Sequence, residues 1–173
     1  MKRWTLIAMA GLALLVATVF GIGLLLPVDH QARVSFAVNA PAARVWQLIT
    51  DVEDFPAWRP DVDEVELLPD VNGLASWNER GSGGTLPLVV EQEDAPHELV
   101  TRIKEGLPFG GTWTYHIEPM DSLHARVTIV EDGEVYNPIF RFVSRFIMGH
   151  DATLNRYREA VEQALRSGPD SDR

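Results

Sequence analysis

The sequence predicts an α+β fold in which a curved antiparallel sheet of about seven strands wraps on a long C-terminal helix, preceded by one transmembrane helix. Three observations predict this fold. Residues 4–28 carry no charged side chain. Residues 62–135 largely alternate between polar and apolar types, a period of two that is typical of strands. From Phe140 onward, apolar residues recur every three or four positions, which is typical of one helix face.

The uncharged run, residues 4–28, is long enough to cross a bilayer. At about 1.5 Å per helical residue it exceeds the roughly 30 Å hydrocarbon core. A cleavable signal peptide is the alternative, but the run is longer than a signal h-region and residues 24–28 contain no small-x-small cleavage site. Lys2 and Arg3 precede the run, and this basic pair favours a cytoplasmic N-terminus. We therefore expect a single-pass anchor in residues 1–28, with the C-terminal domain extracytoplasmic.

The chain after the anchor is acidic and contains no cysteine. It has 25 Asp and Glu against 13 Lys and Arg (15 less Lys2 and Arg3), a net charge of −12 with His neutral. This balance argues against nucleic acid as a partner, because nucleic-acid binding needs basic patches. Disulfides, thiolate zinc sites and cysteine nucleophiles are excluded. The five His show no metal-ligand spacing, so we expect neither a metal nor a cofactor.

Residues 29–166 have the length of one domain, and its first part predicts a strand followed by helices. Residues 33–38 alternate as one strand. We expect Asn39 to cap a helix that begins after Pro41 and buries its apolar stripe, with one more helical turn at residues 54–58.

A meander of six strands should follow, and it makes seven with the first. Short turns rich in Gly, Pro, Asn and Asp separate the strands and make neighbours antiparallel. The expected strands are residues 62–68, 74–81, 85–93, 98–104, 111–118 and 125–135.

The apolar spacing from Phe140 predicts one continuous helix to about Arg166. Its face would carry Phe140, Val143, Ile147, His150, Leu154, Tyr157, Val161 and Leu165. Residues 167–169 (Ser-Gly-Pro) should end the helix, and we expect a disordered tail over residues 167–173.

Several segments resemble the START-like, or SRPBCC, superfamily of polyketide cyclase, lipid-transfer and pollen-allergen-like proteins. They are residues 41–51 with 55–58, residues 111–119, residues 127–135 and residues 137–142. The resemblance covers about residues 34–165. It implies the helix-grip fold, in which the concave sheet and the long helix enclose an apolar cavity, and it is poorly specific for activity.

Strand alternation and helix spacing predict which residues line such a cavity. Apolar and aromatic walls with few polar points are typical of a site for a hydrophobic ligand. The simpler alternative is that these residues only form the core. The expected ligand-binding residues are Trp113, Tyr115, Ile129, Glu131, Phe140, Val143, Ile147, His150 and Leu154.

His150 and Glu131 are the two candidates for acid-base chemistry. His150 stands on the apolar stripe of the helix, where it would satisfy a backbone carbonyl, contact a ligand or transfer a proton. Glu131 shares a strand face with Val127 and Ile129, so it is either an inward carboxylate or a solvated residue near a strand end. No recognisable catalytic set surrounds them.

Three functions remain open at this point. The first is a membrane-anchored domain that binds a hydrophobic small molecule, such as a lipid, a quinone or a polyketide-like compound. The second is a polyketide cyclase or dehydrase-like enzyme. The third is a protein-interaction module at the membrane with a filled core. The sequence leaves the oligomeric state open.

Overall fold

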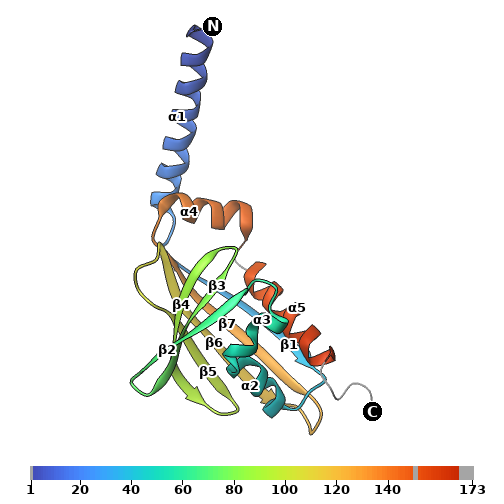
Figure 1. The fold of residues 1–173 in the computed structure, drawn as a ribbon. Helices are drawn as coiled ribbons and strands as arrows, with labels where there is room; N and C mark the ends of the chain where they lie inside the picture. Colours follow the sequence, from blue (N-terminus) through green and yellow to red (C-terminus); the bar gives the residue numbers. More distant parts are fainter. Residues whose placement is uncertain (1, 150–151, 168–173) are drawn as a thin grey trace.

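The computed structural model describes residues 2–149 and 152–167 and confirms the predicted fold class (Figure 1). A helix, α1 (Lys2–Leu25), projects away from a domain built on one curved sheet. The strands are β1 (Asp29–Val38), β2 (Glu64–Val71), β3 (Leu74–Gly81), β4 (Gly84–Asp94), β5 (Glu98–Ile103), β6 (Phe109–Pro119) and β7 (Ala125–Val135). The helices of the domain are α2 (Ala42–Thr50), η1 (Val52–Asp54), α3 (Phe55–Trp58), α4 (Pro138–Val143), η2 (Ser144–Met148) and α5 (Ala152–Ser167).

The seven strands form an antiparallel sheet in the order β1-β7-β6-β5-β4-β3-β2. The predicted meander is therefore confirmed, and the predicted bounds of β3 and β7 match those observed. Alternation locates a strand well because the side chains of one face are buried while those of the other meet water. Strand β1 begins at Asp29, earlier than expected, and pairs with β7 along its whole length.

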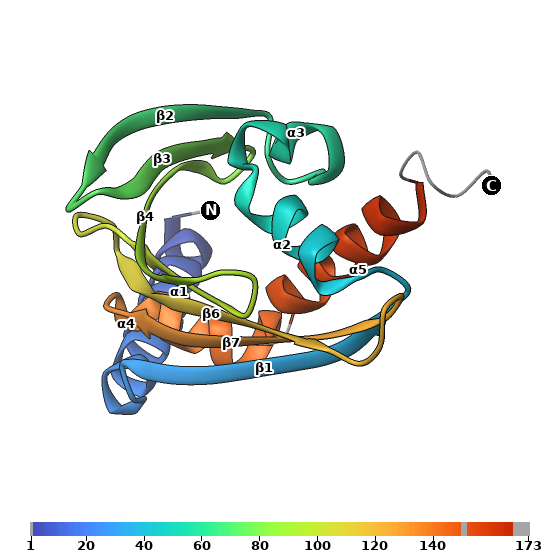
Figure 2. The ribbon, with the colours of Figure 1, turned by 90° about the horizontal axis from the view of Figure 1, so that it is seen from below.

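The concave face of the sheet holds the core (Figure 2). Helices α2, α3 and α5 lie inside the curve, where α5 packs on β1, and α2 on β6 and β7. Deeply buried apolar side chains join these layers, among them Val45 of α2, Ile117 of β6 and Val161 of α5. This burial supplies the main free energy that stabilises the domain.

The C-terminal helix is not continuous, which corrects the prediction of one helix from Phe140 to about Arg166. Helix α4 continues into the π-helical segment η2, and Gly149 then has φ 75° before α5 begins at Ala152. A positive φ is incompatible with a continuing right-handed helix and is readily adopted by glycine. The apolar spacing runs across the break, so it could not reveal it.

The caps of two helices also differ from the expected pattern. Pro41 precedes α2, and no side chain caps that helix, so the predicted Asn39 cap is wrong. Asn137 instead caps α4, where its side-chain oxygen accepts hydrogen bonds from the backbone N–H groups of Ile139 and Phe140. Pro41 itself occupies the N-cap position of α2, and its side chain has no atom that can accept a hydrogen bond from the first helical turn.

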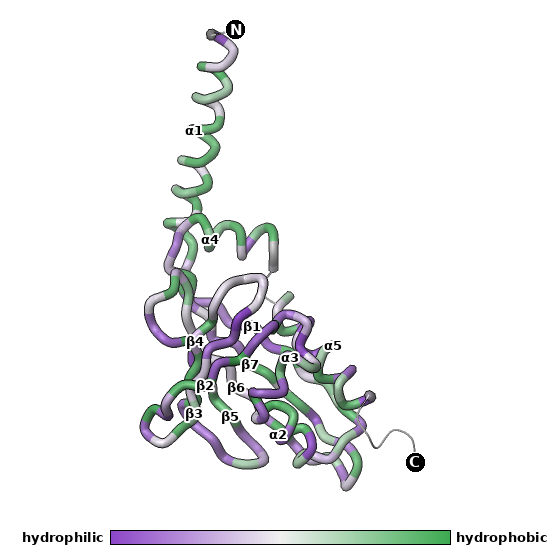
Figure 3. Tube along the Cα trace, in the orientation of Figure 1, coloured by the Kyte–Doolittle hydropathy of each residue, from purple (hydrophilic) through white to green (hydrophobic). Residues whose placement is uncertain are grey.

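Helix α1 is apolar along nearly its whole length (Figure 3). Residues Arg3–Leu25 have a mean hydropathy of 2.4 and are long and apolar enough to span a membrane. Their side chains are almost all exposed, so the domain does not cover them. Helix α4 lies across the C-terminal end of α1, between α1 and the sheet (Figures 1 and 3).

Candidate functional site inside the curve of the sheet

Tyr157 of α5 lies at the centre of an aromatic cluster inside the curve of the sheet. Its ring meets those of Trp58, Trp113 and Tyr115 at centroid distances of 5.7, 5.5 and 5.7 Å. Phe55 continues the cluster, with an edge-to-face contact to Trp58 at 5.5 Å. The rings come from α3, β6 and α5, so the cluster exists only in the folded domain. We call these five residues the aromatic cluster.

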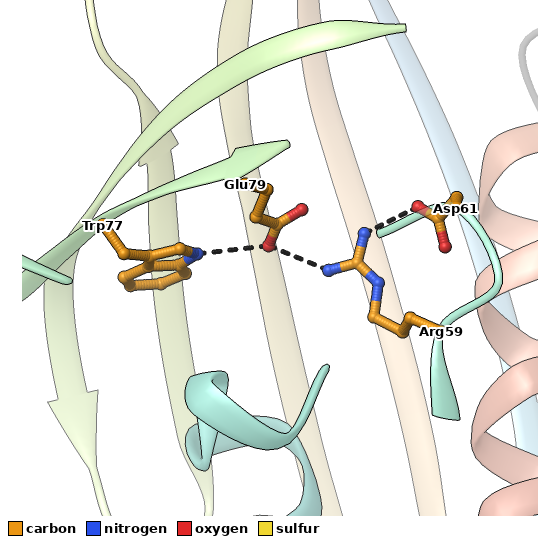
Figure 4. A network of polar contacts seen from close by, with 4 residues as sticks. All are labelled: Arg59, Asp61, Trp77 and Glu79. Atoms are coloured by element: carbon orange, nitrogen blue, oxygen red, sulfur yellow. Dashed lines mark hydrogen bonds and ion pairs between the residues drawn. The ribbon is translucent and has the colours of Figure 1, made fainter. Parts of the chain in front are cut away.

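Arg59 brings a positive charge into the aromatic cluster (Figure 4). Its Nη1 donates to Oε1 of Glu79 at 2.8 Å, and its Nη2 donates to Oδ2 of Asp61 at 2.7 Å. The indole Nε1 of Trp77 donates to the same Glu79 oxygen at 3.2 Å. The guanidinium carbon lies 5.3 Å from the ring centroid of Tyr157. A buried ion pair is therefore in direct contact with the aromatic rings.

Burial and neighbouring charges shift the pKa values of this network so that, at neutral pH, its guanidinium and carboxylate are charged and its two tyrosine hydroxyls are protonated. Burial alone would lower the pKa of Arg59, but the carboxylates of Glu79 and Asp61 together outweigh burial and raise it. Burial would raise the pKa of Asp61, but the hydrogen bond and charge of Arg59 lower it. Burial raises the pKa of Tyr157 to about 12 and that of Tyr115 well above its usual value. Both phenols are protonated at neutral pH.

Hydroxyl and N–H donors lie within the aromatic cluster and on Arg59 beside it. The hydroxyls of Tyr115 and Tyr157 share a hydrogen bond with one another. Trp58 Nε1 and Arg59 Nε are both buried and have no hydrogen-bond partner among the described residues. A buried donor without an acceptor costs roughly 1–3 kcal/mol, so these two groups favour an acceptor atom that is not part of the chain.

Side chains on the inner face of β6 and β7 are fully buried toward one end and partly exposed toward the other, which we call the open end. The side chain of Glu131, nearest α4, is 19% exposed, whereas Ile129 and Val127 further along are 0% and 1% exposed. On β6, Trp113 is partly exposed, and Tyr115 beyond it is buried. The open end of the inner face is the end from which α1 leaves the domain (Figure 1).

Two glycines face one another at this open end. Gly111 of β6 pairs with Gly133 of β7, which pairs in turn with His30 of β1. The His30 ring lies over Gly133, so a Cβ there would be 2.3 Å from its Cε1 atom. His30 Nε2 is 3.6 Å from Oε1 of Glu131. Burial lowers the pKa of His30, partly opposed by Asp29.

The structure brings together five of the nine predicted ligand-binding residues. Trp113, Tyr115, Ile129 and Glu131 share the inner face of the sheet, and the buried Leu154 of α5 lies against the same core. The paired registers also place Glu131 on the face of Val127 and Ile129, as alternation predicted.

The other four residues do not join this group. Phe140 and Ile147 are exposed on α4 and η2, and Val143 between them is half-buried. A ligand contact from these three residues stays a prediction. The exposure of Phe140 and Ile147 favours a contact with something outside the domain. His150 lies outside the described residues.

Sequence reasoning missed Arg59, Asp61 and Glu79. Glu79 is two residues from the buried Trp77 on the same strand, so alternation could have placed it on the inner face. Arg59 and Asp61 lie in a loop with no periodicity, so nothing in the sequence indicates that the Arg59 side chain is buried or that Asp61 pairs with it. The described residues contain no group of three His, Asp or Glu side chains arranged to hold a metal ion.

Two hollows of the described chain lie outside the curve of the sheet. One of about 420 Å³ is formed by Asp29, His30, Gln31, Asp132, Gly133 and Glu134, at the end of the sheet nearest α1. Another of about 540 Å³ lies along the exposed side of α1.

Comparison with known proteins identifies the domain. The family model described as polyketide cyclase / dehydrase and lipid transport matches residues 29–166. A START superfamily protein from Mycobacterium smegmatis is 18% identical with a TM-score of 0.63, over 79% of this chain and 97% of that one. Truncated norcoclaurine synthase from Thalictrum flavum is 14% identical with a TM-score of 0.64, over 82% and 96%.

A third similar structure is the Zhui aromatase/cyclase from Streptomyces sp. R1128. It is 16% identical with a TM-score of 0.59, over 80% of this chain and 97% of that one. At such identities these structures establish a common START-like fold, not a common activity. A search of curated proteins finds no match to this sequence.

Proposed function

Because the chain belongs to the polyketide cyclase/dehydrase and lipid transport family, we propose that its domain binds a hydrophobic small molecule inside the curve of the sheet, held at a membrane by α1. The ligand class is apolar with at least one oxygen acceptor, such as a lipid, a quinone or a polyketide-like compound. The observation that carries this proposal is the aromatic cluster around Tyr157, with unpartnered buried donors beside it.

The chemistry of the cluster matches such a ligand. Aromatic rings offer a large apolar contact area and few rotatable bonds, so they lose little entropy when a ligand binds. The N–H groups of Trp58 and Arg59 supply the few polar points that orient a ligand in an apolar site. The proposed contacts are Trp113, Tyr115, Ile129, Glu131 and Leu154, together with Tyr157.

The anchor and the open end support access from the bilayer. Helix α1 is long and apolar enough to span a membrane, and the open end lies on the side of the domain from which α1 leaves. A tethered domain remains where hydrophobic molecules are concentrated, which raises their effective concentration without any new contact.

Extraction from the full chain tests this proposal. The chain is purified in lipid nanodiscs from its own membrane, and organic-solvent extracts are compared with those of nanodiscs carrying α1 alone. We expect one hydrophobic compound in near-equal amount to the protein. Ile103→Trp, which narrows the open end from the inner face of β5, should remove it. Val100→Trp, on the opposite face of that strand, should retain it.

An extract that is the same for wild type, Ile103→Trp and the α1 control would contradict ligand binding. It would support a second candidate, a protein-interaction module with a filled core. One observation favours that candidate: the rings of the aromatic cluster contact one another directly, with centroids 5.5 to 5.7 Å apart.

A further inference from the structure

An exposed apolar stripe runs along α4 and η2. Four of its five members are between 39% and 71% exposed although all are large and apolar. Val143 lies in the middle of the same stripe and is half-buried. The stripe consists of Ile139, Phe140, Val143, Phe146 and Ile147.

The spacing of these residues places them on one side of the helical segment. Ile139, Phe140 and Val143 follow the series i, i+1 and i+4 of one α-helix face, and the exposed Phe146 and Ile147 follow them in the π-helical segment η2. Phe142 lies outside the stripe, is partly buried and packs on Phe146 with ring centroids 4.9 Å apart. The segment is therefore amphipathic, with its apolar side directed away from the domain.

Two contacts fix α4 against the end of α1. A Cβ at Gly23 would lie 1.9 Å from the carbonyl oxygen of Pro138, so glycine is what permits the two backbones to approach. Arg141 Nη1 donates to the carbonyl oxygen of Leu26 at 2.8 Å. The domain lies on one side of α4, and α1 rises from the other at a steep angle (Figure 1).

The length of α1 gives the depth at which α4 lies. Lys2 and Arg3 are the charged residues that precede the apolar run, so the part of α1 in the hydrocarbon core begins near Trp4. A core of roughly 30 Å, at about 1.5 Å per residue, corresponds to about 20 residues and ends near Gly23. Gly23 is a point of close contact with α4. The segment α4–η2 therefore lies at the level of the far bilayer boundary.

From this arrangement we infer that α4–η2 is a second membrane contact, whose apolar stripe inserts into the boundary between lipid head groups and acyl chains. The inference rests on the proposed anchoring by α1. An apolar helix face of this kind binds in the interface plane with its aromatic side chains below the head groups. Arg145, exposed beside the stripe, can extend its charged end toward the phosphates. The contact holds the open end of the domain against the bilayer.

Site-directed spin labelling of the full chain tests this inference. The chain has no native cysteine, so single cysteines can be introduced at exposed positions without disturbing the core. The labelled chain is placed in vesicles of phosphatidylcholine and phosphatidylglycerol. Collision rates with oxygen, which concentrates in the bilayer, are compared with those of a water-soluble nickel chelate. The labels replace Phe146, Ile147, Leu123 and Leu14.

Leu123 is the matched control, because it is 65% exposed and lies in the β6–β7 turn at the far end of the domain. Leu14 in the middle of α1 reports on the anchor. We expect oxygen collisions to dominate at Leu14, Phe146 and Ile147, and nickel collisions to be severalfold more frequent at Leu123. If oxygen collisions dominate at Leu14 but nickel collisions dominate at Phe146 and Ile147, this inference is overturned and the anchoring by α1 stands. If nickel collisions dominate at Leu14, both the anchoring by α1 and the membrane contact of α4–η2 are overturned.

Discussion

Arg59 and Glu79 form an ion pair inside the curve of the sheet, with Nη1 and Oε1 2.8 Å apart and only 10% and 6% of the two side chains exposed. Such a pair contributes little net stability compared with apolar residues, but removing one partner leaves a buried charge. It also fixes where the guanidinium lies relative to Tyr157 and Phe55. The pair therefore orders the polar part of the candidate site.

We predict that Arg59→Met lowers the free energy of unfolding by about 3–5 kcal/mol, because Glu79 then remains charged and buried. The double variant with Glu79→Leu should recover much of this loss. Chemical unfolding of the full chain in detergent, followed by tryptophan fluorescence, measures both.

Arg80→Met is the control for that prediction. Arg80 neighbours Glu79 in sequence, but its pairs with Glu64 and Glu66 are exposed. Exposed pairs contribute about 0–1 kcal/mol, so this variant should change stability by less than that. The account of the buried pair is wrong if Arg59→Met costs no more than Arg80→Met.

The buried phenol of Tyr157 predicts a loss of stability at high pH. Its pKa rises from 10 in the unfolded chain to about 12 in the folded domain, because burial disfavours the phenolate. The folded state thus keeps the proton more tightly, so its stabilisation is complete below pH 10 and is lost as the pH rises toward about 12. Tyr157→Phe should unfold less steeply over this range. Equal slopes in the two proteins, measured by urea unfolding at several pH values, would contradict this assignment.

The contact between His30 and Gly133 predicts a coupled pair of substitutions. Gly133→Ala should destabilise the domain by roughly 1–3 kcal/mol, because its Cβ would overlap the His30 ring. Removing that ring with His30→Ala should restore most of the loss, which a double-mutant cycle in thermal unfolding would measure.

Gly111→Ala serves as the comparison, because its Cβ would be 2.2 Å from the backbone oxygen of Asp132 and its φ is +123°. His30→Ala cannot relieve that overlap. If His30→Ala restores the stability of Gly111→Ala, or fails to restore that of Gly133→Ala, the His30 ring does not lie over Gly133.

The approach of α4 to α1 predicts an effect of side-chain size at Gly23. Gly23→Leu should move α4 away from α1, since its Cβ alone would overlap Pro138. Gly21→Leu is the control, because nothing lies within 4 Å of a Cβ there. Electron spin resonance between labels at Val16 and Ile147 should show a longer distance for Gly23→Leu only. An unchanged distance in both would place α4 elsewhere.

The sheet was predictable because its evidence is local. Alternation and turn residues lie next to one another in the sequence, and β3 and β7 were found with their observed bounds. Alternation also placed Glu131 on the inner face with Ile129. The resemblance to START-like proteins then supplied the arrangement of sheet and helix, which the family match supports.

The rest of the site depends on contacts between distant residues. Arg59 lies in a loop, and its burial follows from Glu79 on a separate strand. Helix spacing showed correctly that Phe140, Val143 and Ile147 share one face, but spacing carries no information on what that face meets. The helix breaks at Gly149, and Phe140 and Ile147 before the break are exposed whereas Leu154 after it is buried. A glycine in an otherwise regular pattern does not by itself indicate a break.

The native mass spectrum of the full chain, released from nanodiscs prepared from its own membrane, tests the central claim most directly. The account predicts a species heavier than the bare chain by the mass of one hydrophobic molecule, retained at collision energies that strip loosely held lipid and absent from Ile103→Trp. Bare chain alone in wild type, under conditions that keep the domain folded, would contradict the claim that the domain holds a ligand.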